Sequence, residues 1–206
     1  MFLWKQKSEK CRNSLQTKEF AFLQSQNIER KNDFFDRSRK IFKFDDIYRR
    51  GKDLEKRKDG LSNLEIEEYL RPISNFLGVI FDDDLKQLDK SFNGFVIVNL
   101  DQSHGPGTHW IALGIFENTI EFFDPLGCDF LNWPNLPIGL LRYLFKTSFE
   151  KTVVRINRLQ SSKSAVCGLY CMFYIIHRRS FPLQKILDYF DGNRSENDRK
   201  LVRYFK

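Results

Sequence analysis

Two cysteines stand four residues apart in the stretch SAVCGLYCMF, at the predicted start of an apolar helix. Four interpretations are open for them: a catalytic nucleophile, a pair of metal ligands, one half of a disulfide, or core packing. A thiol becomes a useful nucleophile as the thiolate, which the dipole and free N–H groups of a helix N-terminus stabilise. Cys167 would occupy that end, whereas Cys171 lies one turn further on, under the apolar stripe. We therefore expect Cys167 to be reactive and Cys171 to pack in the core.

A cysteine nucleophile needs a base, and one of the three histidines is well placed to supply it. His109 stands where a loop meets a strand, so its ring would project from a rigid sheet edge. An antiparallel hairpin over residues 109–125 would bring Asp124 beside it, where a carboxylate fixes the imidazole tautomer and stabilises the imidazolium. His104 is expected in a solvated loop, and His177 near the C-terminal end of its helix, where it would interact with the helix end.

An acyl-transfer site also needs hydrogen-bond donors for the developing oxyanion. Gln160 lies seven residues before Cys167, at the predicted end of a strand. Its side-chain amide could point at the same carbonyl oxygen as the backbone N–H of Cys167. Gly168, directly after the cysteine, would let a substrate backbone approach closely. Taken alone, Gln160 would be an ordinary surface glutamine, so the hypothesis depends on the whole set.

The elements that must position these residues are helices and buried strands. Ser62 and Glu65 fit a capping box at the start of a helix over residues 62–70. Residues 75–89 are typical of an extended piece followed by a short helix with an aspartate cap. Further strands are expected at 94–101, 109–116, 119–125 and 152–160, and further helices at 138–149, 167–178, 183–190 and 195–205, the last capped by Ser195. The pattern predicts an α+β fold, a central mixed or antiparallel sheet of roughly four or five strands packed by helices.

Charge divides the chain of 206 residues into two parts. Residues 1–60 hold 17 Lys and Arg against 10 Asp and Glu, and residues 61–206 hold 17 of each, so the first part carries the whole net charge of +7. We interpret 1–60 as a basic, partly helical N-terminal arm and 61–206 as the compact domain. Such an arm favours polyanions through phosphate contacts; a solvated, highly charged helical arm is the alternative.

The composition also limits the class of protein. No apolar run reaches the about 18 residues of a membrane-spanning helix, so no membrane partner is expected. The N-terminus becomes charged at Lys5, which excludes a signal-peptide core. Four cysteines in a chain of this length do not make a disulfide framework, and a reducing intracellular compartment is expected.

The ordered set GTHW, FFDPLG and Q-x6-CGLYC resembles the adenovirus maturation protease, adenain, and its relatives in virophages and Polinton/Maverick elements. The SUMO and ubiquitin-like proteases share the framework more distantly. FLGVIFDDDL and GFVIVNLDQSHGPGTHW strengthen the virophage and Polinton comparison, and the likeness covers about residues 62–180. It implies a papain-like, adenain-like cysteine protease fold with the nucleophile at the N-terminus of a buried helix.

Carried over to this sequence, the resemblance implies Cys167 as nucleophile, His109 as base and Asp124 as orienting acid. Gln160 would be the oxyanion-hole donor, and Trp110 would shape the cleft. Adenain has Glu in the third role, whereas the SUMO-protease branch has Asp.

The resemblance further implies a maturation endopeptidase that cleaves capsid precursors at Gly-Gly or Gly-X bonds, in the virion and at the site of virus assembly. It implies no required cofactor, and the basic arm is compatible with DNA as an activator. Adenain is activated by a viral peptide disulfide-linked to a cysteine upstream of the nucleophile. Residues 130–166 contain no cysteine, so activation by that route is not expected.

Other interpretations share parts of this pattern. A deubiquitinase or deSUMOylase would use the same triad, and a non-enzymatic nucleic-acid-binding or scaffold protein would keep a degenerate protease fold. A zinc site of Cys167, Cys171 and His177 lacks a second ligand pair at standard spacing, so no metal is expected.

Overall fold

The computed structural model describes residues 60–206 except 90, 106, 128–136, 148–150 and 155–156, and it describes only the backbone of residues 151–154. The predicted basic arm, residues 1–60, lies outside the described residues apart from Gly60. Its helical content and its boundary with the domain therefore stay predictions.

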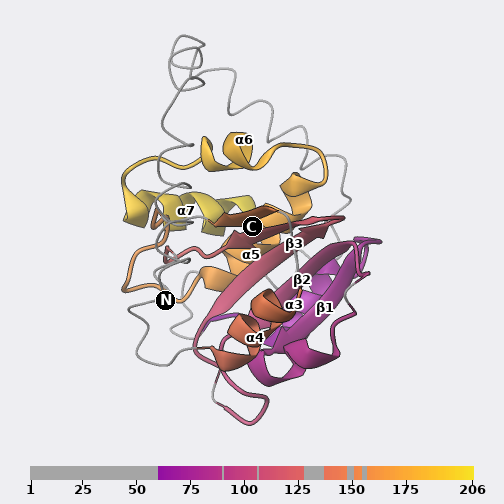
Figure 1. The fold of residues 1–206 in the computed structure, drawn as a ribbon. Helices are drawn as coiled ribbons and strands as arrows, with labels where there is room; N and C mark the ends of the chain where they lie inside the picture. Colours follow the sequence, from indigo (N-terminus) through magenta and orange to yellow (C-terminus); the bar gives the residue numbers. More distant parts are fainter. Residues whose placement is uncertain (1–59, 90, 106, 128–136, 148–150, 155–156) are drawn as a thin grey trace, which may run out of the picture. The chain divides into compact units, whose positions relative to one another are not determined.

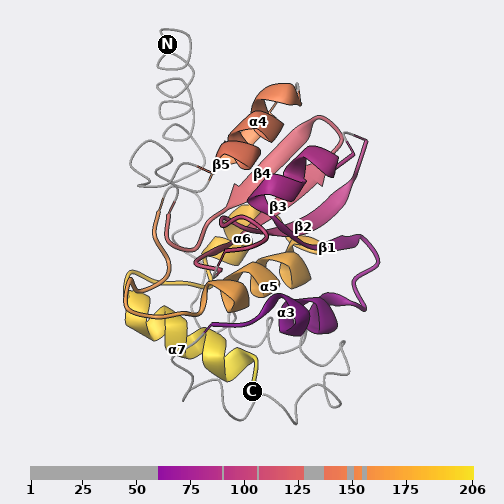
Figure 2. The ribbon, with the colours of Figure 1, turned by 90° about the horizontal axis from the view of Figure 1, so that it is seen from below.

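A five-stranded mixed sheet forms the centre of the described residues, with the strands in chain order from β1 to β5 (Figure 1 and Figure 2). The strands are β1 (Phe76–Phe81), β2 (Gly94–Asn99), β3 (Trp110–Phe116), β4 (Thr119–Phe123) and β5 (Lys151–Val154). β2, β3 and β4 pair antiparallel, whereas β1 and β5 pair parallel to their neighbours. The predicted α+β class and the predicted hairpin are confirmed. The last predicted strand ends earlier than expected, at Val154.

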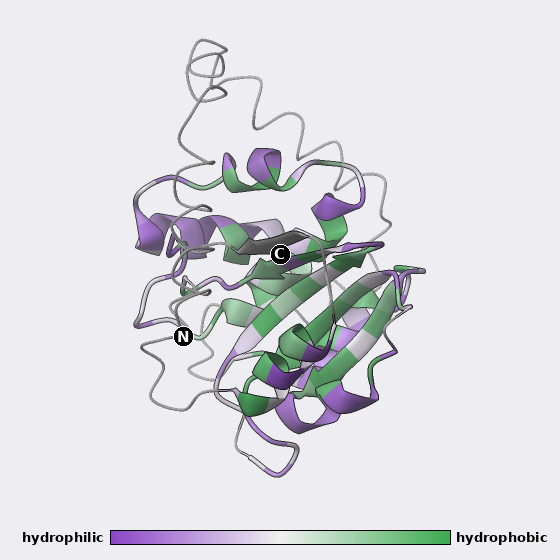
Figure 3. Ribbon diagram, viewed as in Figure 1, coloured by the Kyte–Doolittle hydropathy of each residue, from purple (hydrophilic) through white to green (hydrophobic). Residues whose placement is uncertain are grey.

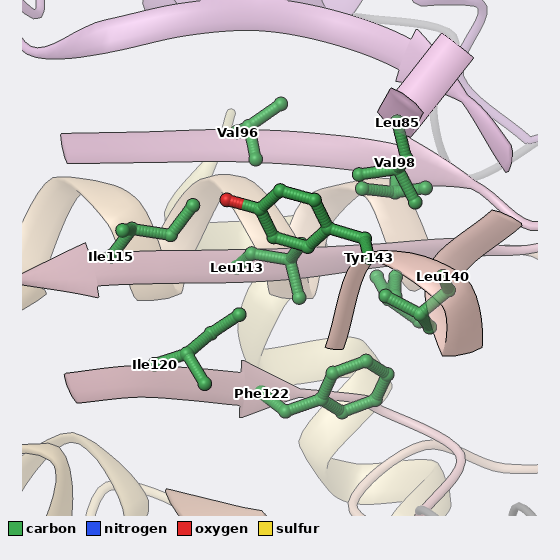
Figure 4. Close-up of a cluster of buried hydrophobic side chains, with 10 residues drawn as sticks. Leu85, Val96, Val98, Leu113, Ile115, Ile120, Phe122, Leu140 and Tyr143 are labelled. Atoms are coloured by element: carbon green, nitrogen blue, oxygen red, sulfur yellow. The ribbon is translucent and has the colours of Figure 1, made fainter. Parts of the chain in front are cut away.

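Helices cover both faces of the sheet, as Figure 2 shows for α4 and α5. The helices are α3 (Asn63–Leu70), the 3-10 helix η3 (Asp82–Gln87), α4 (Ile138–Lys146), α5 (Cys167–Arg178), α6 (Leu183–Leu187) and α7 (Arg194–Tyr204). On one face, Leu140 and Tyr143 of α4 pack with Leu85 of η3 against alternate side chains of β2 and β3, Val98 and Leu113 among them (Figure 4). Alternation along a strand sends the remaining side chains to the other face, where α5 lies.

The helix α5 is buried almost all round. Every residue from Cys167 to His177 is buried, in keeping with a segment that is apolar on all sides. At its far end the guanidinium of Arg178 donates to both oxygens of Glu121 on β4, at 2.7 and 2.8 Å. The outer helix α7 is largely hydrophilic by contrast (Figure 3). The helix that carries the two cysteines is therefore fixed in the core.

Of the three predicted helix caps, one is confirmed and two are wrong. The capping box of Ser62 and Glu65 is present at α3. Ser195 lies inside α7, whose cap is Asn193, with its side-chain oxygen accepting from the Glu196 N–H at 3.1 Å.

The predicted aspartate cap of the short helix η3 is also absent, because Asp82 caps a different helix. Its carboxylate accepts from the N–H groups of Gly139 and Leu140 at 2.8 and 2.7 Å, at the start of α4.

Among the described residues, no helix is both long enough and apolar enough to cross a bilayer.

Replacing Asp82 with Ala should lower the free energy of unfolding by about 2 kcal/mol, because two charge-assisted bonds to the otherwise unpaired N–H groups of α4 are lost. Asp84→Ala serves as the matched control, since the Asp84 carboxylate accepts only a 3.2 Å bond from Gln87 on its own helix. Urea unfolding curves measure both variants. Equal destabilisation by the two substitutions would contradict the role of Asp82.

Candidate active site

The structure gives the two cysteines different surroundings, as the sequence predicted. Cys167 is the first residue of α5 and is 7% exposed, whereas Cys171 is fully buried. The Cys171 thiol donates to the backbone oxygen of Trp110 at 3.4 Å. Burial raises the pKa of Cys171 well above its ordinary value, and negative charge at Cys167 and Asp124 adds to this rise. Cys171 is therefore an unreactive core residue.

His109 lies between Asp124 and Cys167. Its Nε2 donates to Asp124 Oδ1 over 2.7 Å, and the same oxygen accepts from the backbone N–H of Leu126 at 2.8 Å. Because Nε2 is engaged with Asp124, Nδ1 is the ring nitrogen left to interact with the Cys167 side chain, which raises the pKa of His109. The structure thus brings the three predicted residues together in one line of contacts.

The ring of His109 is held in its charged form. Burial by itself lowers its pKa, but the hydrogen bonds to Asp124 and Cys167, and the negative charges of both, raise the pKa to about 9. The ring is therefore an imidazolium at neutral pH, and an imidazolium beside sulfur stabilises the thiolate.

Gln160 is 1% exposed and is not the surface residue that its type alone indicates. It follows β5 in an irregular segment whose backbone N–H groups, at Leu159 and Gln160, both donate to the oxygen of Pro125, at 2.9 and 3.0 Å. Its Nε2 donates to Ser164 O at 2.7 Å, which leaves its second N–H for another acceptor. Pro125 follows Asp124 directly, so the backbone oxygen of Pro125 connects the segment that carries Gln160 to the segment that carries Asp124.

Trp110 and Gly168, predicted to shape the cleft and to admit a substrate backbone, both contact Leu61. Trp110 is buried, and its indole N–H donates to Leu61 O at 3.0 Å. A Cβ on Gly168 would lie 3.2 Å from a methyl group of Ile66 and 3.3 Å from Leu61 Cβ. The missing side chain of Gly168 thus makes room for Leu61 and α3, and the close approach of a substrate backbone to Gly168 stays a prediction. The sequence did not predict the contacts of Leu61 with Trp110 and Gly168, because these residues lie far from Leu61 along the chain.

The other two histidines lie apart from this set of contacts. His104 is exposed and bonds to Ser103 Oγ at 2.9 Å, as expected of a loop residue. The ring of His177 is buried between Phe173 and Tyr204, with Nε2 3.1 Å from the Tyr204 hydroxyl. Burial lowers the pKa of His177 to about 4, so this ring is neutral at neutral pH.

Together, these residues supply the parts of an acyl-transfer site. A thiol at a helix N-terminus can act as a nucleophile, a charged imidazole held by a buried carboxylate can carry a proton, and a buried amide with a spare N–H can donate to an oxyanion.

Comparisons with known proteins point to one family. The family model described as adenovirus endoprotease matches residues 76–198. The protease of frog adenovirus 1 is 30% identical over 159 residues, which are 65% of this chain and 74% of that protein. The protease of porcine adenovirus A serotype 3 is 29% identical over 116 residues, 48% of this chain and 57% of the relative, so this match spans less than two thirds of the relative. A crystal structure of an ASFV protease aligns with a TM-score of 0.46 at 19% identity, over 73% of this chain and 68% of that one.

Replacing Asp124 with Asn should lower the pKa of His109 from about 9 towards its ordinary value, because the carboxylate supplies the strongest of the interactions that raise it. NMR titration of the ring protons measures the change. His177 is the internal control, since burial sets its pKa of about 4 and should continue to do so. An unchanged His109 titration would contradict the role of Asp124.

Proposed function

Since this chain belongs to the adenovirus endoprotease family, we propose that it is a cysteine endopeptidase that cleaves viral precursor proteins. The observation that carries the proposal is the bond between His109 and Asp124, 2.7 Å long, beside the thiol of Cys167. A nucleophile, a proton carrier and an orienting acid in contact are the requirements for thiol-dependent peptide hydrolysis.

In the first half of the reaction, the Cys167 thiolate attacks the carbonyl carbon of the scissile bond, and the C=O electron pair moves to oxygen. The Cys167 backbone N–H and the spare Nε2–H of Gln160 donate to this oxyanion. The oxyanion then collapses, the C–N bond breaks, and the His109 imidazolium gives its proton to the leaving amine. A thioester on Cys167 remains.

In the second half, neutral His109 takes a proton from a water molecule as the water attacks the thioester. The oxyanion forms at the same donors, and its collapse expels Cys167 as the thiolate beside a regenerated imidazolium. Asp124 keeps the ring oriented through both halves, because its bond to Nε2 leaves Nδ1 directed at the sulfur.

The proposal extends to the substrate and the place of action. Capsid precursors cut at Gly-Gly or Gly-X bonds, in the virion or at the site of virus assembly, agree with the family and with the fragments that resemble virophage and Polinton proteases. The charge of +7 carried by residues 1–60 supports nucleic acid as a partner of the arm.

The purified full chain should cleave the major capsid precursor, and Cys167→Ala should lower the rate by about 10⁴-fold or more. Cys171→Ala, at the second cysteine of the same helix, is the matched control and should retain cleavage. Gel electrophoresis with mass spectrometry of the products measures the rate and the cleaved bond.

Equal cleavage by the wild type and Cys167→Ala, or cleavage by neither, would count against the proposal. Ubiquitin and SUMO vinyl sulfone probes form a separate arm of the experiment. Labelling of Cys167 by these probes, without cleavage of the precursor, would replace the endopeptidase with an isopeptidase.

A further inference from the structure

The helix α7 contacts the segment that carries Gln160, although α7 belongs to neither the hairpin nor α5. We propose that Asp198 on α7 is a positioning residue that orients the Gln160 amide as an oxyanion donor, through the turn of residues 161–164. This inference rests on the proposed function, because it concerns a step of that reaction.

The backbone on both sides of Gln160 is fixed by hydrogen bonds. Leu159 O accepts from the Tyr170 hydroxyl at 3.1 Å and from Asn197 Nδ2 at 3.3 Å. The N–H of Ser161 donates to the carboxylate of Asp198, at 3.4 and 3.3 Å from its two oxygens. Two adjacent residues of α7 therefore hold the backbone immediately before and immediately after the glutamine.

The turn that Asp198 holds also sets the direction of the Gln160 side chain. Ser161 O accepts from the backbone N–H of Ser164 at 3.3 Å and from its hydroxyl at 3.1 Å. This closes the turn, and the oxygen of Ser164 then accepts Gln160 Nε2 at 2.7 Å. If the Gln160 amide rotated by half a turn, its oxygen would lie against Ser164 O, and two acceptors cannot bond to each other. The position of Ser164 O therefore determines that the NH2 end of the amide faces it.

The amide of Gln160 depends on this turn because little else holds it. Its Oε1 is buried and has no hydrogen-bond partner among the described residues. The bond to Ser164 is the one that the described residues provide for this side chain. If the turn relaxes, the amide loses its anchor, and a buried unpartnered oxygen favours rotation toward a donor or solvent.

The position of Asp198 is itself determined by α5. The Tyr170 hydroxyl lies 3.0 Å from Asp198 Oδ1 and 3.1 Å from Leu159 O, and it has one hydrogen for these two acceptors. Burial raises the pKa of Asp198. A donor at position 198 that bonds to the Tyr170 oxygen would leave the hydroxyl hydrogen for Leu159 O. An asparagine can reproduce this pattern, since its amide donates to Tyr170 and its oxygen accepts from Ser161.

The thiolate and imidazolium should not depend on Asp198, because the sheet holds His109 and Asp124. Loss of Asp198 should therefore weaken oxyanion stabilisation and leave the nucleophile intact. In kinetic terms, kcat falls while KM stays nearly constant, because the donor acts in the transition state.

The kinetic test uses the full chain and the capsid precursor. Asp198→Ala should lower kcat by about 10- to 100-fold, somewhat less than the loss of a whole oxyanion donor. Asp198→Asn should restore most of the rate, and Asp188→Ala, at the exposed aspartate that follows α6, should match the wild type. Combined with Gln160→Ala, Asp198→Ala should add no further loss, because both act on the same donor. Alkylation of Cys167 by iodoacetamide should keep its wild-type rate in every variant.

Additive losses in the double variant would overturn the proposal, and so would slower alkylation in Asp198→Ala. A chain that cleaves no precursor in the wild type would refute the proposed function before any variant is compared. In that case, hydrogen exchange measured by mass spectrometry still tests the positioning role of Asp198, because it does not require a cleaved substrate.

In the exchange experiment, Asp198→Ala should speed exchange in residues 159–166 by about tenfold or more, while residues 169–176 of α5 keep their protection. Unchanged exchange in 159–166 would overturn the proposal. If the alanine variant loses protection throughout α5, Tyr170→Phe replaces it, because it removes only the hydroxyl, and the same local effect is required.

Discussion

The antiparallel register of β3 and β4 is the constraint on which the rest of the site depends. Ala112 lies opposite Phe123, and Phe116 lies opposite Thr119 across a turn of two residues. This register places the residue before β3 level with the residues after β4, so His109 meets Asp124. Side chains alternate along a strand, and a slip of one residue would send the carboxylate to the other face of the sheet. The contact between His109 and Asp124 is thus determined by pairing along the whole hairpin.

The second requirement is that α5 lies close against this hairpin. The Cys171 thiol bonds to the backbone of Trp110, next to His109, and Arg178 bonds to Glu121 on β4. A Cβ on Gly114 would lie 2.5 Å from the Tyr174 hydroxyl, so a glycine in β3 is needed for this approach. The helix N-terminus is therefore fixed where the imidazole of His109 can reach Cys167.

Local patterns predicted much of this arrangement because they reflect burial and hydrogen bonding within one segment. The apolar run of α5, the alternating hairpin and the capping box of Ser62 are all of this kind. The positions of Cys167, His109 and Asp124 follow from them.

Several of the incorrect or incomplete predictions have a common cause, which is contact between distant segments. Asp82 caps a helix that begins more than fifty residues later in the chain, and Gly168 accommodates Leu61. Gln160 is buried because Pro125, Tyr170 and α7 surround its segment, and periodicity contains no information on such contacts. The roles of the site residues in turnover stay predictions until the enzyme is assayed.

In the proposed reaction His109 activates Cys167, and the rate of Cys167 alkylation by iodoacetamide reports on this activation. The rate is measured at neutral pH in the wild type and in His109→Ala, with peptide mapping to separate Cys167 from Cys171. We expect selective, rapid labelling of Cys167 that falls by about tenfold or more without the imidazole, because the thiolate loses its cationic partner. Equal rates in the two proteins, or faster labelling of Cys171, would contradict it.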